Sequence, residues 1–183
     1  MFIFCCFNNV YKITPEIFEC WMKILRSCDD SMLWLLADSN ASSEALKQHA
    51  KALGIDPARL VFAPKLPLDR HLRRLKMADV FLDTFPYNAH TTASDALWCG
   101  VPIVTMSGNS FASRVAGSFL HHIGVNHGIA LSLSEYERNA IEYYTNSRLL
   151  SDVKLRLGVE NQSLPLFDIQ KFKQFYEEAL LQA

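Results

Sequence analysis

The chain has 183 residues, of which half are apolar and a fifth are charged. This length can bury one hydrophobic core, and the proportions are those of an ordinary soluble α/β domain. The formal net charge of −1 provides no field that would attract nucleic acid or an anionic membrane. No apolar run approaches the roughly 18–20 residues that span a bilayer, and the N-terminal MFIFCCFNN lacks the basic region and cleavage site of a signal peptide.

The five cysteines are Cys5, Cys6, Cys20, Cys28 and Cys99. Their odd number and the absence of a C-x-x-C pair predict neither a disulfide framework nor a zinc site. All five lie in apolar stretches, where a free cysteine usually serves as a small packing residue. We therefore expect a reducing, cytoplasmic location and no bound metal.

Short apolar runs alternate with amphipathic segments along most of the chain. Five such runs predict strands, at residues 2–7, 32–36, 60–62, 80–82 and 103–105. The first predicted helix follows the N-cap Thr14, and the second is capped by Ser42 or Ser43. Further helices are predicted at residues 67–77, directly after residue 90, and at 110–123, 134–145, 149–157 and 168–181.

Strands that alternate with helices indicate βαβ units, and hence a parallel sheet with right-handed crossovers. We predict an α/β fold, a Rossmann-like doubly wound parallel sheet with a helical C-terminal tail. The whole chain, 1–183, is expected to form a single ligand-binding lobe, with the sheet region in 1–131 and the C-terminal helices in 132–183. Ligands of such sheets bind outside the carboxyl ends of the strands, so the loops that follow the strands are the candidates for a site.

The loop after the fourth predicted strand leads into a helix headed by His90, Thr91 and Thr92. The first turn of a helix leaves about four backbone N–H groups unpaired and carries roughly half a positive charge. Two threonine hydroxyls add donors, so this pattern suits a phosphate or diphosphate, and Asp95, one turn later, could accept from sugar hydroxyls. The alternative is a plain threonine N-cap with Asp95 favouring the helix dipole.

Two further segments follow strands on the same edge of the predicted sheet. Asn9 and Lys12 come after the first strand, where a lysine can neutralise a departing diphosphate and an amide can hydrogen-bond to it. The alternative is a solvated surface lysine. The segment PKLPLDRHLRR, residues 64–74, offers loop backbone to a base edge and His71 to a base plane. Here the alternative is a basic helix face with snorkelling arginines.

Several familiar enzyme motifs are absent. The sequence contains no G-x-S-x-G, P-loop or H-E-x-x-H motif and no pair of carboxylates suited to glycoside hydrolysis. The first predicted strand is not followed by G-x-G-x-x-G, which argues against an NAD enzyme.

Three long stretches carry a family resemblance: FNNVYKITPEIFECWMKIL, ADVFLDTFPYNAHTTASDALWCGVPIVTM and SFASRVAGSFL. They closely resemble the carboxyl-terminal half of the O-GlcNAc transferase / SPINDLY family, glycosyltransferase family 41. The resemblance runs from about Phe4 to the last predicted helix. It implies a GT-B fold of two Rossmann-like lobes, and an inverting, metal-independent transfer of GlcNAc from UDP-GlcNAc to serine or threonine hydroxyls of proteins without a cofactor.

The resemblance also implies roles for individual residues at the diphosphate. Lys12 matches the lysine that stabilises the departing UDP diphosphate. Asn9 stands where the animal enzymes have glutamine, an amide with the same chemistry. His90, Thr91 and Thr92 match the residues that hold the diphosphate.

A second set of residues matches the ribose and the base. Asp95 corresponds to the ribose-binding aspartate. The residues that match the segments around the uracil are Leu66, Pro67, Leu68, His71, Leu72, Arg73 and Arg74. Leu68 stands where the animal enzymes carry a lysine, so one nucleotide contact is expected to differ.

The resemblance covers the second lobe alone. The first lobe, with its histidines near the sugar and acceptor, and the tetratricopeptide repeats that recruit protein substrates have no counterpart in this sequence. UDP-GlcNAc or UDP, protein acceptors and the first lobe are the expected partners, and the general base is expected outside this chain. We expect the isolated chain to bind UDP weakly and to transfer little or no sugar.

Two other functions remain compatible with the sequence. A SPINDLY-type lobe would use GDP-fucose, although His90 and Asp95 favour the O-GlcNAc branch, and a non-catalytic lobe would serve as an interaction surface. The last predicted helix also carries an apolar stripe that predicts self-association unless something else covers it. The stripe consists of Phe172, Phe175, Tyr176, Ala179 and Leu180.

Overall fold

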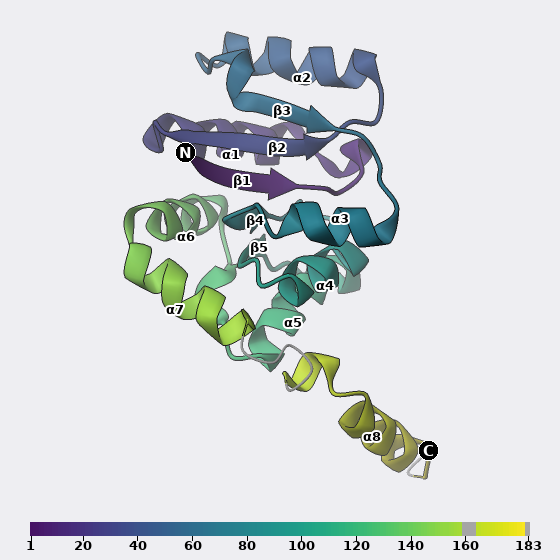
Figure 1. The fold of residues 1–183 in the computed structure, drawn as a ribbon. Helices are drawn as coiled ribbons and strands as arrows, with labels where there is room; N and C mark the ends of the chain where they lie inside the picture. Colours follow the sequence, from purple (N-terminus) through teal and green to yellow (C-terminus); the bar gives the residue numbers. More distant parts are fainter. Residues whose placement is uncertain (159–163, 182–183) are drawn as a thin grey trace.

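The computed structural model describes residues 1–158 and 164–181, and its centre is one six-stranded sheet. The strand order is β3-β2-β1-β4-β5-β6, and each neighbouring pair is parallel. The strands are β1 (Phe2–Cys6), β2 (Ser31–Leu36), β3 (Leu60–Ala63), β4 (Val80–Leu82), β5 (Ile103–Met106) and β6 (Ile129–Ala130). The predicted fold class is confirmed (Figure 1). Only β6 was not predicted, because its two residues are too few for a pattern.

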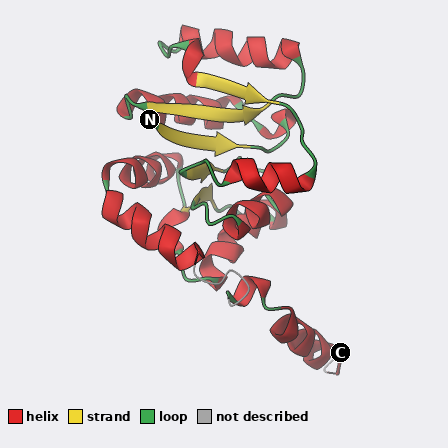
Figure 2. Ribbon diagram, in the orientation of Figure 1, coloured by secondary structure: helices red, strands yellow, loops and turns green. Residues whose placement is uncertain are grey.

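Helices connect the strands and form the C-terminal part of the described chain (Figure 2). The α-helices are α1 (Pro15–Ser27), α2 (Asn40–Ala52), α3 (Leu68–Leu75), α4 (Thr91–Trp98), α5 (Val115–His122), α6 (Leu133–Thr145), α7 (Ser147–Gly158) and α8 (Ile169–Leu181). Thr14 caps α1 as predicted, because its side chain accepts from the amide of Ile17.

Two predicted helix starts were wrong, and a reciprocal pair of serines lies near each of them. The cap of α2 is Ser39: its hydroxyl accepts from the amide of Ser42 (3.1 Å), and the hydroxyl of Ser42 accepts from the amide of Ser39 (3.2 Å). Ser110 and Ser113 form the same pair around a short 3-10 turn, so that α5 starts at Val115 rather than near residue 110.

The sheet reverses its order of growth between β1 and β4. From β1 the chain adds β2 and β3 on one side, and from β4 it adds β5 and β6 on the other. Right-handed crossovers therefore place the connecting helices on opposite faces. Consistent with this, α1 packs against α6, while α3, α4 and α5 contact one another in turn. The reversal leaves a crevice at the carboxyl ends of β1 and β4.

A buried polar chain links the helical layer to the sheet beneath this crevice. Trp21 of α1 and Tyr136 of α6 are both 0% exposed. The Nε1 of Trp21 donates to the hydroxyl of Tyr136 (3.1 Å), which donates in turn to the main-chain oxygen of Asp83 (2.8 Å). Both hydroxyl and indole are thus satisfied inside the core, and α1 and α6 are fixed relative to the end of β4.

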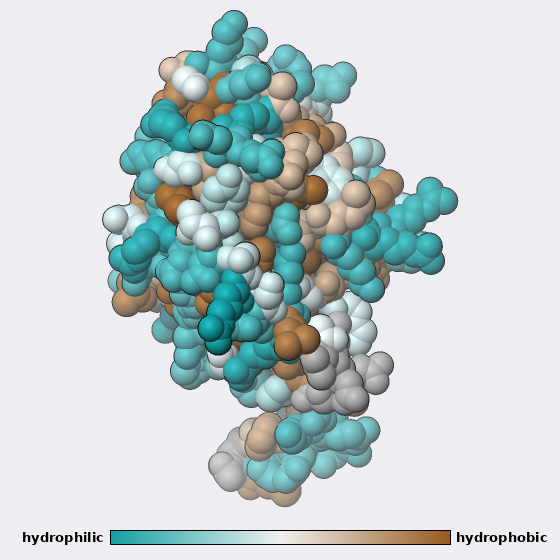
Figure 3. Space-filling model, turned by 60° about the vertical axis from the view of Figure 1, so that its left-hand side comes forward, coloured by the Kyte–Doolittle hydropathy of each residue, from teal (hydrophilic) through white to brown (hydrophobic). Residues whose placement is uncertain are grey.

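The helix α8 projects away from the sheet domain (Figure 1). The apolar residues of its stripe are exposed, with Phe172 at 65%, Phe175 at 59% and Tyr176 at 57%. In the space-filling view, hydrophobic and hydrophilic surface lie side by side on this segment (Figure 3). Within the described ranges, every helix is too short or too polar to cross a bilayer.

A glycine substitution tests the packing around β6. A Cβ on Gly128 would overlap the main-chain oxygen of Ile103 in β5, so Gly128→Ala should lower the free energy of unfolding by about 1–3 kcal/mol. The matched control is Gly158→Ala, because a Cβ at Gly158 meets nothing within 4 Å, and its effect should stay within about 0.5 kcal/mol. Urea unfolding measures both, and equal effects would contradict the close approach.

Candidate functional site

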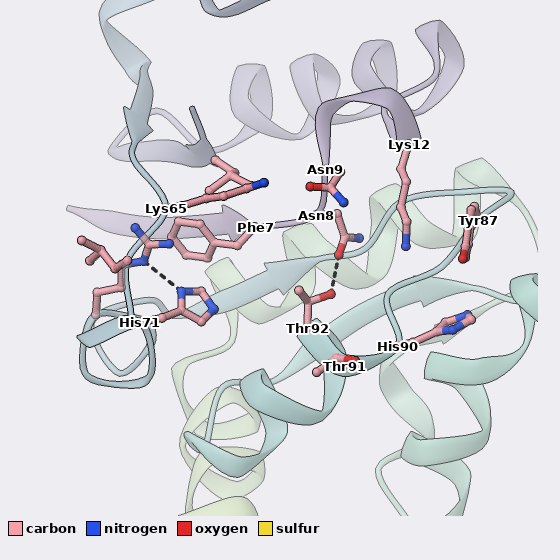
Figure 4. Close-up of a pocket in the computed structure, with 13 residues that line it drawn as sticks. Phe7, Asn8, Asn9, Lys12, Lys65, His71, Tyr87, His90, Thr91 and Thr92 are labelled. Carbon is pink, nitrogen blue, oxygen red and sulfur yellow. Dashed lines mark hydrogen bonds between the residues drawn. The ribbon is translucent and has the colours of Figure 1, made fainter. Parts of the chain in front are cut away.

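A cavity of about 460 Å³ opens where the sheet reverses its order, at the carboxyl ends of β1 and β4. Side chains reach it mainly from the segments that follow β1, β3 and β4 (Figure 4). The lining residues are Phe7, Asn8, Asn9, Lys12, Leu36, Lys65, Leu66, His71, Arg74, Tyr87, His90, Thr91 and Thr92. This is the place where open α/β sheets bind their ligands.

The head of α4 forms one end of the cavity. His90 is the N-cap, and its carbonyl accepts from the amides of Ala93 and Ser94 at 3.1 and 3.0 Å. In the part of the chain that the structure describes, the amides of Thr91 and Thr92 meet no acceptor. Two N–H donors therefore remain available at the positive end of a helix dipole, an arrangement that suits phosphate oxygens.

Lys12 brings a positive charge to the same end of the cavity. Its Nζ donates to the carbonyl oxygen of Asn88 (3.0 Å) and lies 3.8 Å from the centre of the Tyr87 ring (Figure 4). Across residues 1–158 and 164–181, no carboxylate forms an ion pair with this ammonium. Its charge is therefore available to an anion.

The imidazole of His90 lies beside the ring of Tyr87 and carries an unsatisfied nitrogen. The ring contacts Tyr87 and Phe111 in edge-on fashion, with centroid distances of 5.4 and 6.0 Å. Its Nε2 is buried without a hydrogen-bond partner among the described residues. A buried polar atom without a partner costs free energy, and this nitrogen has no surface that a ligand could reach while the ring keeps this position.

His71 and Arg74 of α3 form the other end of the cavity. Arg74 donates from Nε to Nδ1 of His71 (3.0 Å) and from Nη1 to the carbonyl oxygen of Pro64 (2.6 Å). Its guanidinium lies 4.3 Å from the centre of the Phe7 ring. Burial, and then the charge of Arg74, lowers the pKa of His71, which favours the neutral imidazole near pH 7. A neutral ring held in this way suits stacking on a nucleobase.

Beneath the cavity, the carboxylate of Asp83 joins three segments of the chain. Its Oδ1 accepts from the amides of Thr84 and Ala89 (both 2.7 Å) and from Nδ2 of Asn8 (3.1 Å). Its Oδ2 accepts from the hydroxyl of Thr105 (2.7 Å). Burial raises the pKa of Asp83 to about 6, and the four hydrogen bonds act in the opposite direction.

Asn8 connects this carboxylate to α4. Its Nδ2 donates to Asp83 and to the hydroxyl of Thr84 (2.8 Å), and its Oδ1 accepts from the hydroxyl of Thr92, as the dashed line in Figure 4 shows. The sequence predicts both threonine hydroxyls as donors to a ligand. In the structure the hydroxyl hydrogen of Thr92 is used on Asn8, so that Thr92 offers its amide, and only Thr91 keeps a free hydroxyl.

The side chains do not gather into a metal site within the described ranges, where no three His, Cys, Asp or Glu residues lie close enough to hold an ion. All five cysteines are free thiols, and burial raises the pKa of each of them. They therefore act as packing residues, as their apolar surroundings predict.

The family model for glycosyl transferase family 41 matches residues 1–176. The chain belongs to glycosyltransferase family 41. This agrees with the resemblance in the sequence.

Curated relatives of this family 41 chain include three named transferases. The probable UDP-N-acetylglucosamine–peptide N-acetylglucosaminyltransferase SEC of Arabidopsis thaliana is 39% identical over 172 residues, 93% of this chain and 18% of the relative. The UDP-N-acetylglucosamine–peptide N-acetylglucosaminyltransferase of Caenorhabditis elegans is 38% identical over 178 residues, with shares of 97% and 16%. A protein of Solanum lycopersicum with the same probable activity, SPINDLY, is 32% identical over 171 residues, with shares of 91% and 18%. The chain spans less than a fifth of each relative.

A solved structure shares the fold of this family 41 lobe. An O-GlcNAc transferase mutant from Thermobaculum terrenum superimposes with a TM-score of 0.93 at 30% identity, covering 98% of this chain and 35% of that one. The match confirms the fold expected from the resemblance, a Rossmann-like lobe of a GT-B glycosyltransferase.

The cavity brings together many of the residues predicted for the family 41 site, namely Asn9, Lys12, Leu66, His71, Arg74, His90, Thr91 and Thr92. Pro67 is the N-cap of α3, Leu68 and Arg73 are exposed on that helix, and Leu72 is half-buried against the core. Asp95 lies one turn into α4, and burial raises its pKa. These five do not line the cavity, and their ligand contacts stay predictions.

Five lining residues were not predicted as part of the site. Phe7 and Leu36 end apolar strands, so their pattern indicates only core. Asn8 follows a buried strand as the first polar residue, which is the signal that could have indicated it. Lys65 lies in the segment at residues 64–74, which was predicted to act through its backbone and His71, and Tyr87 lies in a stretch that the resemblance covers without a role for its ring.

The raised pKa of Asp83 predicts a pH-dependent stability. Its pKa is about 6 in the folded chain against an ordinary value of 3.8, so between these values the folded state keeps a proton that the unfolded state has released. The unfolding free energy of the wild type, minus that of Asp83→Asn, should therefore rise by up to about 3 kcal/mol as the pH falls from about 7 to about 4. Urea unfolding at each pH measures this difference, and a constant value would contradict the raised pKa.

Proposed function

We propose that the chain is the donor-binding lobe of an inverting protein O-GlcNAc transferase, and that its cavity binds UDP-GlcNAc. One observation carries the proposal: the unpaired amides of α4 and the ammonium of Lys12 meet at one end of a cavity whose other end is the His71–Arg74 pair. The first end suits a diphosphate and the second a base, which together describe a nucleoside diphosphate. The names of the relatives at 38 and 39% identity support the choice of sugar and acceptor.

Each part of UDP has a proposed partner. The uracil lies against the His71 ring, with the main chain around Leu66 at its edge. The ribose hydroxyls donate to the half-buried carboxylate of Asp95. The diphosphate accepts from the amides of Thr91 and Thr92.

In the proposed transfer, the acceptor oxygen forms a bond to the anomeric carbon while the bond from that carbon to the diphosphate oxygen breaks. The electron pair stays with the departing UDP, so negative charge develops on the diphosphate. Lys12 and the head of α4 stabilise this charge more strongly than that of the bound donor. The proton of the acceptor hydroxyl passes to a general base outside this chain. The residues in these roles require no metal or other cofactor.

We further propose that the chain alone transfers little or no sugar. It spans 16–18% of the curated relatives and 35% of the solved one, and a single lobe neither excludes water from the donor nor positions an acceptor. The first lobe and protein acceptors are therefore the proposed partners. A cytoplasmic location and self-association through α8 stay predictions from the sequence.

A lobe that uses GDP-fucose, the donor that the sequence resemblance implies for SPINDLY-type relatives, is the second candidate. The higher identity to the two O-GlcNAc-type relatives favours UDP-GlcNAc. A lobe that binds no nucleotide, and serves only as an interaction surface, is the third.

Binding measurements with a panel of nucleotides distinguish these three candidate functions. The 183-residue chain should bind UDP and UDP-GlcNAc in calorimetry, with GDP and GDP-fucose at least about tenfold weaker, which corresponds to about 1.4 kcal/mol. Stronger binding of the guanine nucleotides would support the second candidate. Absence of any binding up to millimolar concentrations would support the third and refute the proposed function.

Replacement of Lys12 tests the diphosphate end of the cavity. Lys12→Ala removes one charge-assisted contact and should weaken UDP binding about ten- to a hundredfold, with a smaller effect on UMP. Because the side chain is only partly buried, the unfolding free energy should change little. Lys23→Ala is the control: Lys23 is exposed on α1 and does not line the cavity. Equal effects of the two variants on UDP would contradict a direct contact.

A further inference from the structure

We propose that Asp83 is a positioning residue for nucleotide binding, which holds the diphosphate end of the cavity in place without touching the ligand. This assignment rests on the proposed function. The side chain of Asp83 is 0% exposed and does not line the cavity, so it acts only through its neighbours.

The burial of a charge at this position requires an explanation. The preceding residues of β4, Val80 to Leu82, are apolar and fully buried, and an apolar side chain would fill the next site at lower cost. A buried carboxylate is tolerated only where hydrogen bonds satisfy it. The four donors around Asp83 come from the segment after β1, the loop after β4, and β5. The carboxylate thus fixes three separate segments relative to one another.

One path from Asp83 leads to Thr92. Asp83 and the hydroxyl of Thr84 accept both hydrogen bonds from Nδ2 of Asn8, which turns Oδ1 of Asn8 towards Thr92. An amide that is not held from behind can rotate and present its nitrogen instead. The carboxylate therefore determines which way the hydroxyl of Thr92 points at the head of α4.

A second path leads to Lys12 and His90. The amide of Ala89 donates to Asp83, which fixes the chain on both sides of that residue. Asn88, just before it, supplies the carbonyl that holds the ammonium of Lys12, and His90, just after it, is the N-cap of α4. Lys12 and the head of α4, which carries the amides proposed to meet the diphosphate, thus take their positions from one carboxylate.

The test measures UDP binding by calorimetry at about pH 8 with the 183-residue chain and two variants. Asp83→Asn keeps the shape and removes the charge, which weakens three or four hydrogen bonds, so UDP should bind at least about fivefold more weakly. Tyr136→Phe is the matched control, because it removes a buried hydrogen bond to the main-chain oxygen of Asp83 and leaves the carboxylate untouched. It should lower the melting temperature by several degrees and keep the UDP affinity within about twofold.

The affinity for a ligand, measured across a series of pH values, distinguishes a positioning role of Asp83 from a loss of stability alone. UDP-GlcNAc is the probe, because its diphosphate diester has no proton to gain in this range. The other titratable groups around Asp83 are Cys6 of β1 and Tyr136 of α6, and burial raises the pKa of each away from this pH range. The charged side chain nearest to them, Lys12, is the same in the proteins compared. The affinity of the wild type should fall at least about threefold as Asp83 gains its proton near pH 6. His71, whose pKa burial lowers, is present in both proteins, so the smaller fall expected for Asp83→Asn isolates Asp83.

The outcomes distinguish the proposed function from the positioning role of Asp83. If the wild type does not bind UDP, the proposed function is wrong. If the wild type binds and Asp83→Asn binds equally well, or Tyr136→Phe weakens binding as much as Asp83→Asn does, the positioning role alone is wrong. If Asp83→Asn does not fold, the pH series of the wild type decides, and an affinity that is unchanged between about pH 8 and 5 would overturn the assignment.

Discussion

The carboxylate of Asp83 lies at 0% exposure beneath the crevice between β1 and β4, and the site above it depends on the hydrogen bonds that converge there. Above about pH 6 this charge opposes folding, because burial disfavours the ionised form. The same charge organises the loop that leads into α4. Stability is therefore given up at one position so that the donors at the head of a helix face a ligand, which is a common compromise at functional sites.

The two ends of the cavity differ in their chemistry. At the α4 end, a helix terminus and one ammonium provide positive charge, and Lys12 is held by a carbonyl and a ring face rather than by a carboxylate. Its full charge is thus available to the ligand. At the α3 end, Arg74 is occupied by His71 and Pro64 and serves to fix a neutral ring. Charge is placed where an anion would lie, and a flat polar surface where a base would lie.

Much of the fold follows from local pattern. The buried strands β1 to β5 are largely apolar runs, and Thr14 caps α1 as its place in the sequence predicts. The start of α2 was missed because Ser39 acts with Ser42, and the pattern offers several serines of equal quality. The start of α5 was placed too early because a separate 3-10 turn follows Ser110, and α5 itself starts after Arg114 without a side-chain cap. The two-residue β6 depends on contacts with β5, which no local pattern contains.

The site residues that could be predicted are those whose side chain suits an anion and which also follow a strand or begin a helix. A lysine after one strand and threonines at a helix head indicated Lys12, Thr91 and Thr92, and the family resemblance singled them out from ordinary surface residues. Asp83 gave no signal, because a single acid after a strand is typical of a loop, and two of its four donors, Asn8 and Thr105, come from distant parts of the sequence. Tyr87 was missed for the same reason: its contact with Lys12 joins residues that are distant in the sequence.

We propose that UDP binds with its diphosphate at the head of α4. Amide chemical shifts of the isotope-labelled chain, recorded by NMR during a UDP titration, test this most directly. We expect the amides of Thr91 and Thr92 to shift most, together with residues around His71, and those of α8 to stay unchanged. Shifts confined to other parts of the chain, or no shifts at millimolar UDP, would contradict it.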